Sequence, residues 1–273
     1  MVFAESSISA INSYGYSPYP LAQYLSWVRD ILNKNIDSDK PVIISITSSK
    51  PEELASMVAA IQTLRRELND LSRTPSRVAI EVNTSCPNIK HTSPSGYSFK
   101  LLTPLLKVLA TEYAADKTLT IGLKLPPYVY REQFTDVLEV LSSLGVPTPV
   151  AFLTCTNTLG STLLFPDQTT TSLASNAANS EFAVPTATGG LSGESIHALA
   201  LGNVYTFSTL LREARFVPAL SGIRIIGVGG VTSKPAFDRM RKAGANAVAC
   251  ATLYGKEGVR AFEIIGSGKS ENE

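Results

Sequence analysis

Six short runs of apolar residues, rich in valine, isoleucine and threonine, recur along the chain. Most of them are nearly continuous in hydrophobicity rather than alternating, which is typical of strands covered on both faces of a parallel sheet. The runs predict strands over residues 42–47, 78–84, 120–125, 151–157, 224–230 and 247–253.

Helical patterns fill most of the intervals between these strands. Apolar residues repeat there at three- and four-residue spacing. Pro51 stands at a plausible helix start, and Gly145 and Gly244 stand where helices should end. We expect helices over residues 21–32, 52–68, 99–114, 131–144, 204–214 and 235–243.

Strand–helix alternation fits either a doubly wound open sheet or a (β/α)8 barrel. A dinucleotide-binding fingerprint would follow an early strand of the open sheet, and the first third of the chain has none. Polar residues or glycine doublets instead follow nearly every strand, as they do at the mouth of a barrel. We therefore predict a single α/β domain over residues 1–273 with the TIM (β/α)8 barrel fold.

Two of the eight strands of such a barrel are not recognisable in the pattern, which gives six βα units. Residues 1–20, rich in Ser, Tyr and Pro, are expected to be irregular. The segment of about residues 160–195 is dense in Ser, Thr, Ala, Asn and Gly. We expect it to be a long inserted loop, either functional or disordered.

Charge and composition narrow the classes of partner. The 273 residues include 24 Lys and Arg against 23 Asp and Glu, and no basic run argues for nucleic acid. No apolar stretch is long enough to span a bilayer, and no targeting segment is visible. Three cysteines fit a reducing compartment, and with the two histidines they show no metal-ligand spacing. These features favour a cytoplasmic protein without a membrane, nucleic-acid or metal partner.

The most informative stretch is Asn-Thr-Ser-Cys-Pro-Asn at residues 83–88, which follows a predicted buried strand. The amides of Asn83 and Asn88 suit a planar ligand that offers both donors and acceptors. Cys86 is a candidate base or nucleophile, and a small buried thiol in a tight turn is an equal alternative. Cys155 and Cys250 lie inside apolar runs and are expected in the core.

Lys124 lies near the end of another apolar strand, where a buried charge is costly unless it faces a polar cavity. It is a candidate for stabilising negative charge on a ligand, and the alternative is a side chain that escapes to solvent. Asn157 and Thr158 end the next strand and are either ligand contacts or turn residues.

Glycine pairs end the strands near the carboxyl terminus, where barrels often bind phosphate through backbone N–H groups. Gly229 and Gly230 are followed by Ala251 and Thr252 one strand later, and residues 189–193 could add further amides. An ordinary tight turn is the alternative for each pair. Nothing pairs His91 or His197 with another catalytic group, and we expect both to be packed or solvated.

Together these stretches resemble the dihydroorotate dehydrogenases, and more closely the soluble class with a cysteine base and fumarate as acceptor. The resemblance covers nearly the whole chain and is carried by residues 11–16, 83–88, 122–128, 155–160, 227–230 and 252. The Asn-x-Ser-Cys-Pro-Asn and Lys-Leu-Pro-Pro-Tyr stretches are its most specific parts.

The resemblance implies an FMN-linked barrel that oxidises dihydroorotate to orotate in pyrimidine synthesis, as a cytoplasmic homodimer. Cys86 would be the base, and Lys124 would lie beside the flavin. Implied substrate residues are Asn12, Tyr14, Gly15, Tyr16, Asn83, Asn88, Asn157 and Thr158. Ser192 is an implied FMN-binding residue, and the implied residues for the FMN phosphate are Gly193, Gly229, Gly230, Ala251 and Thr252.

Family members begin with two strands and a flavin-contacting lysine that have no counterpart before Ile11 and Asn12 here. Three smaller departures are single residues. The family usually has Leu at the position of Thr84, often Met at that of Tyr14, and usually Gly at that of Ala251. The alternatives are a truncated, catalytically impaired relative and a flavin enzyme for another pyrimidine. A phosphate-binding isomerase without flavin is more distant.

Overall fold

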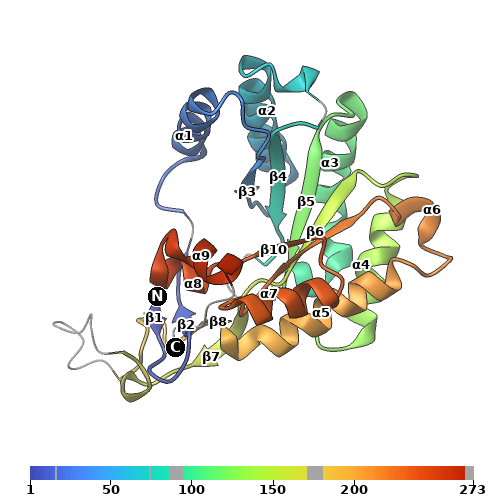
Figure 1. Ribbon diagram of the computed structural model, residues 1–273. Helices are drawn as coiled ribbons and strands as arrows, with labels where there is room; N and C mark the ends of the chain where they lie inside the picture. The colour runs from blue at the N-terminus through green and yellow to red at the C-terminus, as the bar shows by residue number, and fades with distance from the viewer. Residues whose placement is uncertain (16, 74, 86–94, 171–180, 268–273) are drawn as a thin grey trace.

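A computed structural model describes residues 1–15, 17–73, 75–85, 95–170 and 181–267. Its larger sheet has six parallel strands that lie side by side in chain order (Figure 1). They are β3 (Val42–Ile46), β4 (Val78–Asn83), β5 (Thr120–Leu125), β6 (Val150–Cys155), β9 (Arg224–Val228) and β10 (Ala247–Ala249). Each of the six predicted strands is therefore confirmed, although β10 ends four residues earlier than its apolar run.

Helices follow most of these strands and cover one face of the sheet (Figure 1). The longer ones are α1 (Leu21–Lys34), α2 (Pro51–Glu67), α3 (Thr103–Ala115), α4 (Arg131–Ser143), α5 (His197–Leu210) and α7 (Lys234–Lys242). The shorter ones are α6 (Val217–Leu220), α8 (Thr252–Glu257) and α9 (Arg260–Ser267). Five short 3-10 turns are also present in the described residues: η1 (Asp70–Ser72), η2 (Ser95–Tyr97), η3 (Phe99–Leu102), η4 (Pro166–Gln168) and η5 (Glu194–Ile196).

The predicted glycine ends of α4 and α7 are confirmed, whereas α3 and α5 start at other residues than predicted. The predicted start at Phe99 is the 3-10 turn η3, and α3 begins at Thr103. Gly145 and Gly244 come just after α4 and α7 and adopt φ of +144° and +113°, a region that favours glycine. Helix α5 begins at His197, seven residues before the predicted start at Val204. Gly202 lies inside it and weakens the local helical signal, which explains the late start of the sequence prediction.

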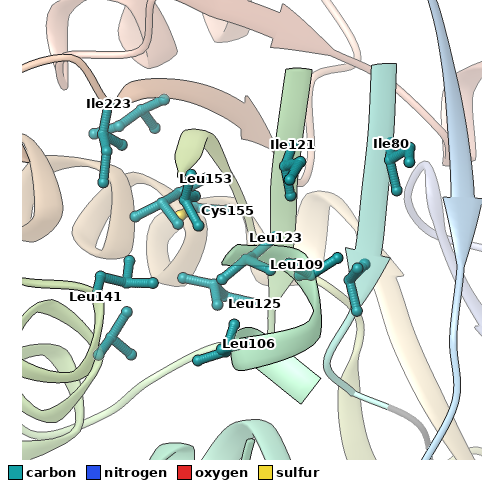
Figure 2. Packing of buried hydrophobic residues seen from close by; sticks show 14 of the residues in the cluster. Ile80, Leu106, Leu109, Ile121, Leu123, Leu125, Leu141, Leu153, Cys155 and Ile223 are labelled. Carbon is teal, nitrogen blue, oxygen red and sulfur yellow. The ribbon is translucent and has the colours of Figure 1, made fainter. Parts of the chain in front are cut away.

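Alternate residues of the parallel strands form the hydrophobic core against the helices. Ile121, Leu123 and Leu125 of β5 are fully buried there. Leu106 and Leu109 of α3 pack over the same sheet face, as Figure 2 shows. Each such side chain stabilises the fold by about 1.5–3 kcal/mol relative to exposure. The residues in between, including Gly122 and Lys124, therefore face the opposite, concave side of the sheet.

Parallel strands in chain order with helices on the outer face are the architecture of the (β/α)8 barrel. The structure confirms this fold class, with six recognisable βα units. Within the described residues, β3 and β10 form the two edges of the larger sheet. No helix in these parts of the chain is both long and apolar enough to cross a bilayer.

A second sheet combines segments that the sequence pattern did not identify as strands. Its antiparallel order is β1 (Val2–Phe3), β2 (Ser9–Asn12), β8 (Thr188–Gly193) and β7 (Leu159–Leu163). Residues 1–20 and 160–195 are therefore not wholly irregular. The pairing places Ser9 opposite Gly193 and Asn12 opposite Gly190, which brings the start of the chain to the end of β8.

A buried ionic network joins α2 to the segments before β4 and β5. Arg65 is fully buried, and its guanidinium donates to Asp70 Oδ2 at 3.1 Å and to Asp116 Oδ2 at 2.6 Å. Asp70 also accepts a hydrogen bond from the backbone N–H of Arg77 at 2.7 Å. A buried pair of this kind is costly to break, because the remaining charge is left without a partner.

Replacing Asp116 with asparagine is expected to destabilise the protein by about 2.5 kcal/mol at pH 7. Burial raises the pKa of Asp116, but hydrogen bonds from Thr118, Gln62 and Arg65 outweigh it and lower the pKa to about 2. The stabilisation is thus fully present above the unfolded-state pKa of about 3.9 and is lost as pH falls towards 2.

Urea unfolding at pH 7 and at pH 2.5 measures this loss. Asp39→Asn is the matched control, because the Asp39 side chain is 98% exposed and touches Arg73 only at 3.9 Å. Equal stability of the two variants at pH 7 would contradict the stabilising role of the Asp116 carboxylate. So would a difference in stability between them that is the same at pH 2.5 as at pH 7.

Candidate active site

A pocket opens at the carboxyl ends of the strands, where β5, β6, β9 and β10 meet the end of β8. This is the end of a barrel at which ligands bind. All the predicted cofactor residues line the pocket, together with two predicted substrate residues. They are Lys124, Asn157, Thr158, Ser192, Gly193, Gly229, Gly230, Ala251 and Thr252. Segments that are far apart in the sequence are thus brought to one site.

One end of the pocket is built from glycine backbone and hydroxyl groups. Gly193, Gly229 and Gly230 have φ of +82°, +132° and +64°, conformations that favour glycine. Thr252 Oγ1 donates to Ser192 Oγ at 3.0 Å. Ser192 Oγ in turn donates to the carbonyl of Ala10 at 3.1 Å, so both hydroxyl protons have partners within the protein. Ala251 has φ of −120°, a negative value that does not require glycine. Backbone N–H groups are the donors that remain for an anion such as phosphate.

Gly193→Ala is expected to destabilise the protein by about 2–3 kcal/mol. A Cβ there would lie 2.1 Å from the carbonyl oxygen of Ile8, and the positive φ adds strain. Gly202→Ala is the matched control, since Gly202 lies inside α5 with no atom within 4 Å of its Cβ position. That substitution should stabilise the helix by about 0.5–1 kcal/mol. Thermal unfolding compares the two, and equal stability would contradict the close packing of β2 on β8.

Lys124 and Asn157 also line the pocket, and Asn83 lies beside Asn157 without lining it. The strand register places Lys124 between Asn83 of β4 and Thr154 of β6. Asn157 Nδ2 donates to Asn83 Oδ1 at 3.0 Å, and Asn157 Oδ1 accepts from the N–H of Thr158 at 2.8 Å. The ammonium of Lys124 has no hydrogen-bonding partner among the described residues. A cation beside two oriented amides suits a planar ligand that carries or develops negative charge.

Polar residues that the sequence analysis did not single out also contribute. Thr156 lines the pocket, is 3% exposed, and its Oγ1 has no partner within the described structure. Below Lys124, the buried Glu81 accepts from Thr154 Oγ1 at 2.6 Å and from Ser45 Oγ at 3.4 Å. Glu81 could have been noticed in the sequence, because it is a carboxylate inside the apolar run 78–84. Thr156 directly precedes Asn157, but no pattern distinguished it from a strand residue.

Several predicted substrate residues lie outside this pocket. Asn12 Nδ2 donates to the carbonyl of Gly190 at 3.2 Å. Gly190 in turn packs directly against Thr158, since a Cβ on Gly190 would meet Thr158 Oγ1. Asn12 is therefore separated from the pocket residue Thr158 by Gly190. Tyr14 is 68% exposed and Gly15 is exposed, and neither lines the pocket.

The predicted residues Tyr16, Cys86 and Asn88, and also His91, lie outside the described residues. The flanks of the segment that contains Cys86 are described. The N–H of Gly96 donates to the carbonyl of Thr84 at 2.9 Å, so both flanks lie at the carboxyl end of β4. Asn83 Oδ1 accepts from the N–H of Ser85 at 3.1 Å there.

The other two cysteines do not line the pocket. Cys155 is fully buried, as predicted, and burial raises the pKa of its thiol. Cys250 is only half-buried just beyond β10, and burial raises the pKa of its thiol too. In the described part of the chain, His, Cys, Asp and Glu form no cluster of three that could hold a metal ion.

The fold and the pocket at its strand ends define a (β/α)-barrel enzyme. A sequence profile of the family described as dihydroorotate dehydrogenase matches residues 2–270. The chain therefore belongs to the dihydroorotate dehydrogenase family and is an oxidoreductase of that type.

Curated streptococcal proteins are similar to most of the chain. A Streptococcus pyogenes serotype M5 protein named dihydroorotate dehydrogenase A (fumarate) is 28% identical over 264 residues, which are 96% of this chain and 72% of the relative. A Streptococcus pneumoniae serotype 4 protein of the same name has the same identity and coverage. One from Streptococcus agalactiae serotype V is 27% identical, with 73% of the relative covered.

Proposed function

We propose that the protein binds FMN and oxidises dihydroorotate to orotate in pyrimidine biosynthesis, with fumarate as the electron acceptor. The observation that carries the proposal is the convergence of Lys124, Asn157 and the Gly229–Gly230 pair on one pocket. The family membership and the names of the streptococcal relatives support the substrate and the acceptor.

The pocket residues fit FMN. Gly193, Gly229, Gly230, Ala251 and Thr252 would hold its phosphate through backbone N–H groups, with Ser192 beside them in the pocket. The unpartnered, buried Thr156 Oγ1 marks a polar position that a ligand would satisfy. When bound, FMN supplies the acceptor for the two electrons and the hydrogen that leave substrate carbon C6.

The remaining residues would bind the pyrimidine and take its proton. Asn83 and Asn157 hold each other in fixed orientations, which lowers the cost of orienting a planar substrate. Lys124 would stabilise the negative charge that develops at the flavin edge. We assign Cys86 as the base that takes the proton from substrate carbon C5. Asn12, Asn88, Thr158 and the segment of Tyr14, Gly15 and Tyr16 complete the proposed substrate contacts.

Orotate formation from dihydroorotate with fumarate, under anaerobic conditions, tests the proposed reaction. The account predicts orotate in proportion to fumarate consumed. Oxidation of a different dihydropyrimidine instead of dihydroorotate would favour the alternative of a flavin enzyme with another substrate.

By the same resemblance we propose a cytoplasmic homodimer. Analytical ultracentrifugation of the FMN-loaded protein tests the assembly, and a monomer at micromolar concentration would contradict it.

A further inference from the structure

His197, which the sequence left without a partner, is held in a chain of hydrogen bonds behind the glycine pair. Its Nδ1 lies 2.8 Å from the carbonyl oxygen of Gly229, and Arg239 Nε donates to its Nε2 at 3.2 Å. An arginine N–H only donates, so Nε2 must accept. The ring proton of a neutral His197 therefore lies on Nδ1, which donates to Gly229.

The carbonyl of Gly229 and the N–H of Gly230 belong to one planar peptide group. A hydrogen bond that fixes the direction of the carbonyl therefore also fixes the direction of the N–H. A Cβ on Gly230 would lie 2.5 Å from His197 Cβ, so the histidine packs directly against this peptide. Gly230 lines the pocket, whereas His197 lies behind it.

A second contact holds the far end of the same loop. Glu194 Oε1 accepts from Thr232 Oγ1 at 2.8 Å, and Oε2 accepts from the N–H of Ile8 at 3.1 Å. Glu194 is the first residue of η5, and His197 begins α5 immediately after that turn. The loop from Gly229 to Thr232 is thus fixed at both ends by one short segment of the chain.

We propose that His197 is a positioning residue for the anion end of the pocket. It orients the Gly229–Gly230 peptide so that the Gly230 N–H is directed for a phosphate group, and Arg239 selects the tautomer that does this. The inference rests on the proposed FMN binding. Gly229 and Gly230, with φ of +132° and +64°, have many alternative conformations. A backbone donor between them therefore needs an external constraint to keep a fixed direction.

Flavin fluorescence titration with FMN and with riboflavin, which lacks the phosphate, separates positioning from general stability. His197→Ala should weaken FMN binding by about 3- to 10-fold, as expected for loss of one net hydrogen bond. Riboflavin binding should stay unchanged. His197→Asn places an amide N–H near the Nδ1 position and should restore most of the FMN affinity. Tyr205→Ala is the matched control on α5, because Tyr205 is 62% exposed.

Arg239 is tested separately, because its removal also removes a positive charge. Arg239→Gln keeps a donor for Nε2 and should retain FMN affinity, whereas Arg239→Ala should lose part of it. Equal losses in both variants would contradict the assignment of Arg239 to tautomer selection.

Two further outcomes would overturn the inference about His197. One is unchanged FMN affinity in His197→Ala, and the other is an equal loss of FMN and riboflavin binding, which indicates a purely structural role. Failure of the folded wild-type protein to bind FMN is a different result, since it contradicts the proposed cofactor itself and the inference with it.

Discussion

Replacing Cys86 with alanine is expected to slow the reduction of bound FMN by dihydroorotate by about 10²- to 10⁴-fold, the usual contribution of a positioned base. The proton on substrate carbon C5 would then have no acceptor in place. FMN affinity should be unchanged, because the proposed FMN contacts come from other strands. Anaerobic stopped-flow measurement of flavin bleaching gives the rate directly.

Two variants make the Cys86 experiment specific. Cys250→Ala removes the half-buried thiol beyond β10 and should leave the rate unchanged. Cys86→Ser retains a group that can accept a proton and should be faster than Cys86→Ala. A rate for Cys86→Ala within about threefold of wild type, far below the loss expected on removing a general base, would show that another group takes the proton.

Replacing Lys124 with methionine is expected to slow flavin reduction by about 10²- to 10³-fold, comparable to the loss of one preorganised electrostatic contact. Methionine preserves much of the length and removes the charge. The ammonium lines the pocket and has no partner among the described residues, so its charge is available to a ligand. Stopped-flow reduction and the flavin midpoint potential, which should fall, are the two measurements.

Lys107→Met is the matched control for Lys124, because Lys107 is exposed on α3 and lies away from the pocket. It should change neither the rate nor the potential. An unchanged potential and rate in Lys124→Met would contradict the assigned role, whereas loss of folding would be seen first as a lower thermal midpoint than that of the control.

The parallel strands were predictable because their signal is local. Each is a short, nearly continuous apolar run such as residues 120–125, and the central strands β4, β5 and β6 are buried on both faces. The same logic predicted that polar residues after different strands would lie together, because the carboxyl ends of parallel strands meet at one end of a barrel. Lys124 of β5, and Asn157 and Gly229, which follow β6 and β9, line one pocket.

The antiparallel sheet was not predictable from local pattern. Its strands are short and rich in serine and glycine, and β2 pairs with β8 across more than 170 residues of sequence. The stability of such strands comes from tertiary contacts rather than from intrinsic propensity. Asn12 lies beside Gly190 because β2 pairs with β8, and the residues next to Asn12 in the sequence do not indicate this contact.

Single polar residues without a motif were the other gap. Glu81, Thr156 and His197 gain their significance from neighbours on other elements: Thr154, the pocket wall and Gly229. A sequence shows that a buried carboxylate or a helix-start histidine exists, but only the strand register and the packing of α5 show what each contacts.

The visible spectrum of the purified 273-residue chain, loaded with FMN, desalted and then mixed anaerobically with dihydroorotate, tests the central claim most directly. The account predicts flavin absorbance that survives desalting and bleaches on addition of dihydroorotate. A colourless protein after desalting would contradict the assignment of the pocket to FMN. Retained flavin absorbance that dihydroorotate does not bleach would contradict the proposed substrate.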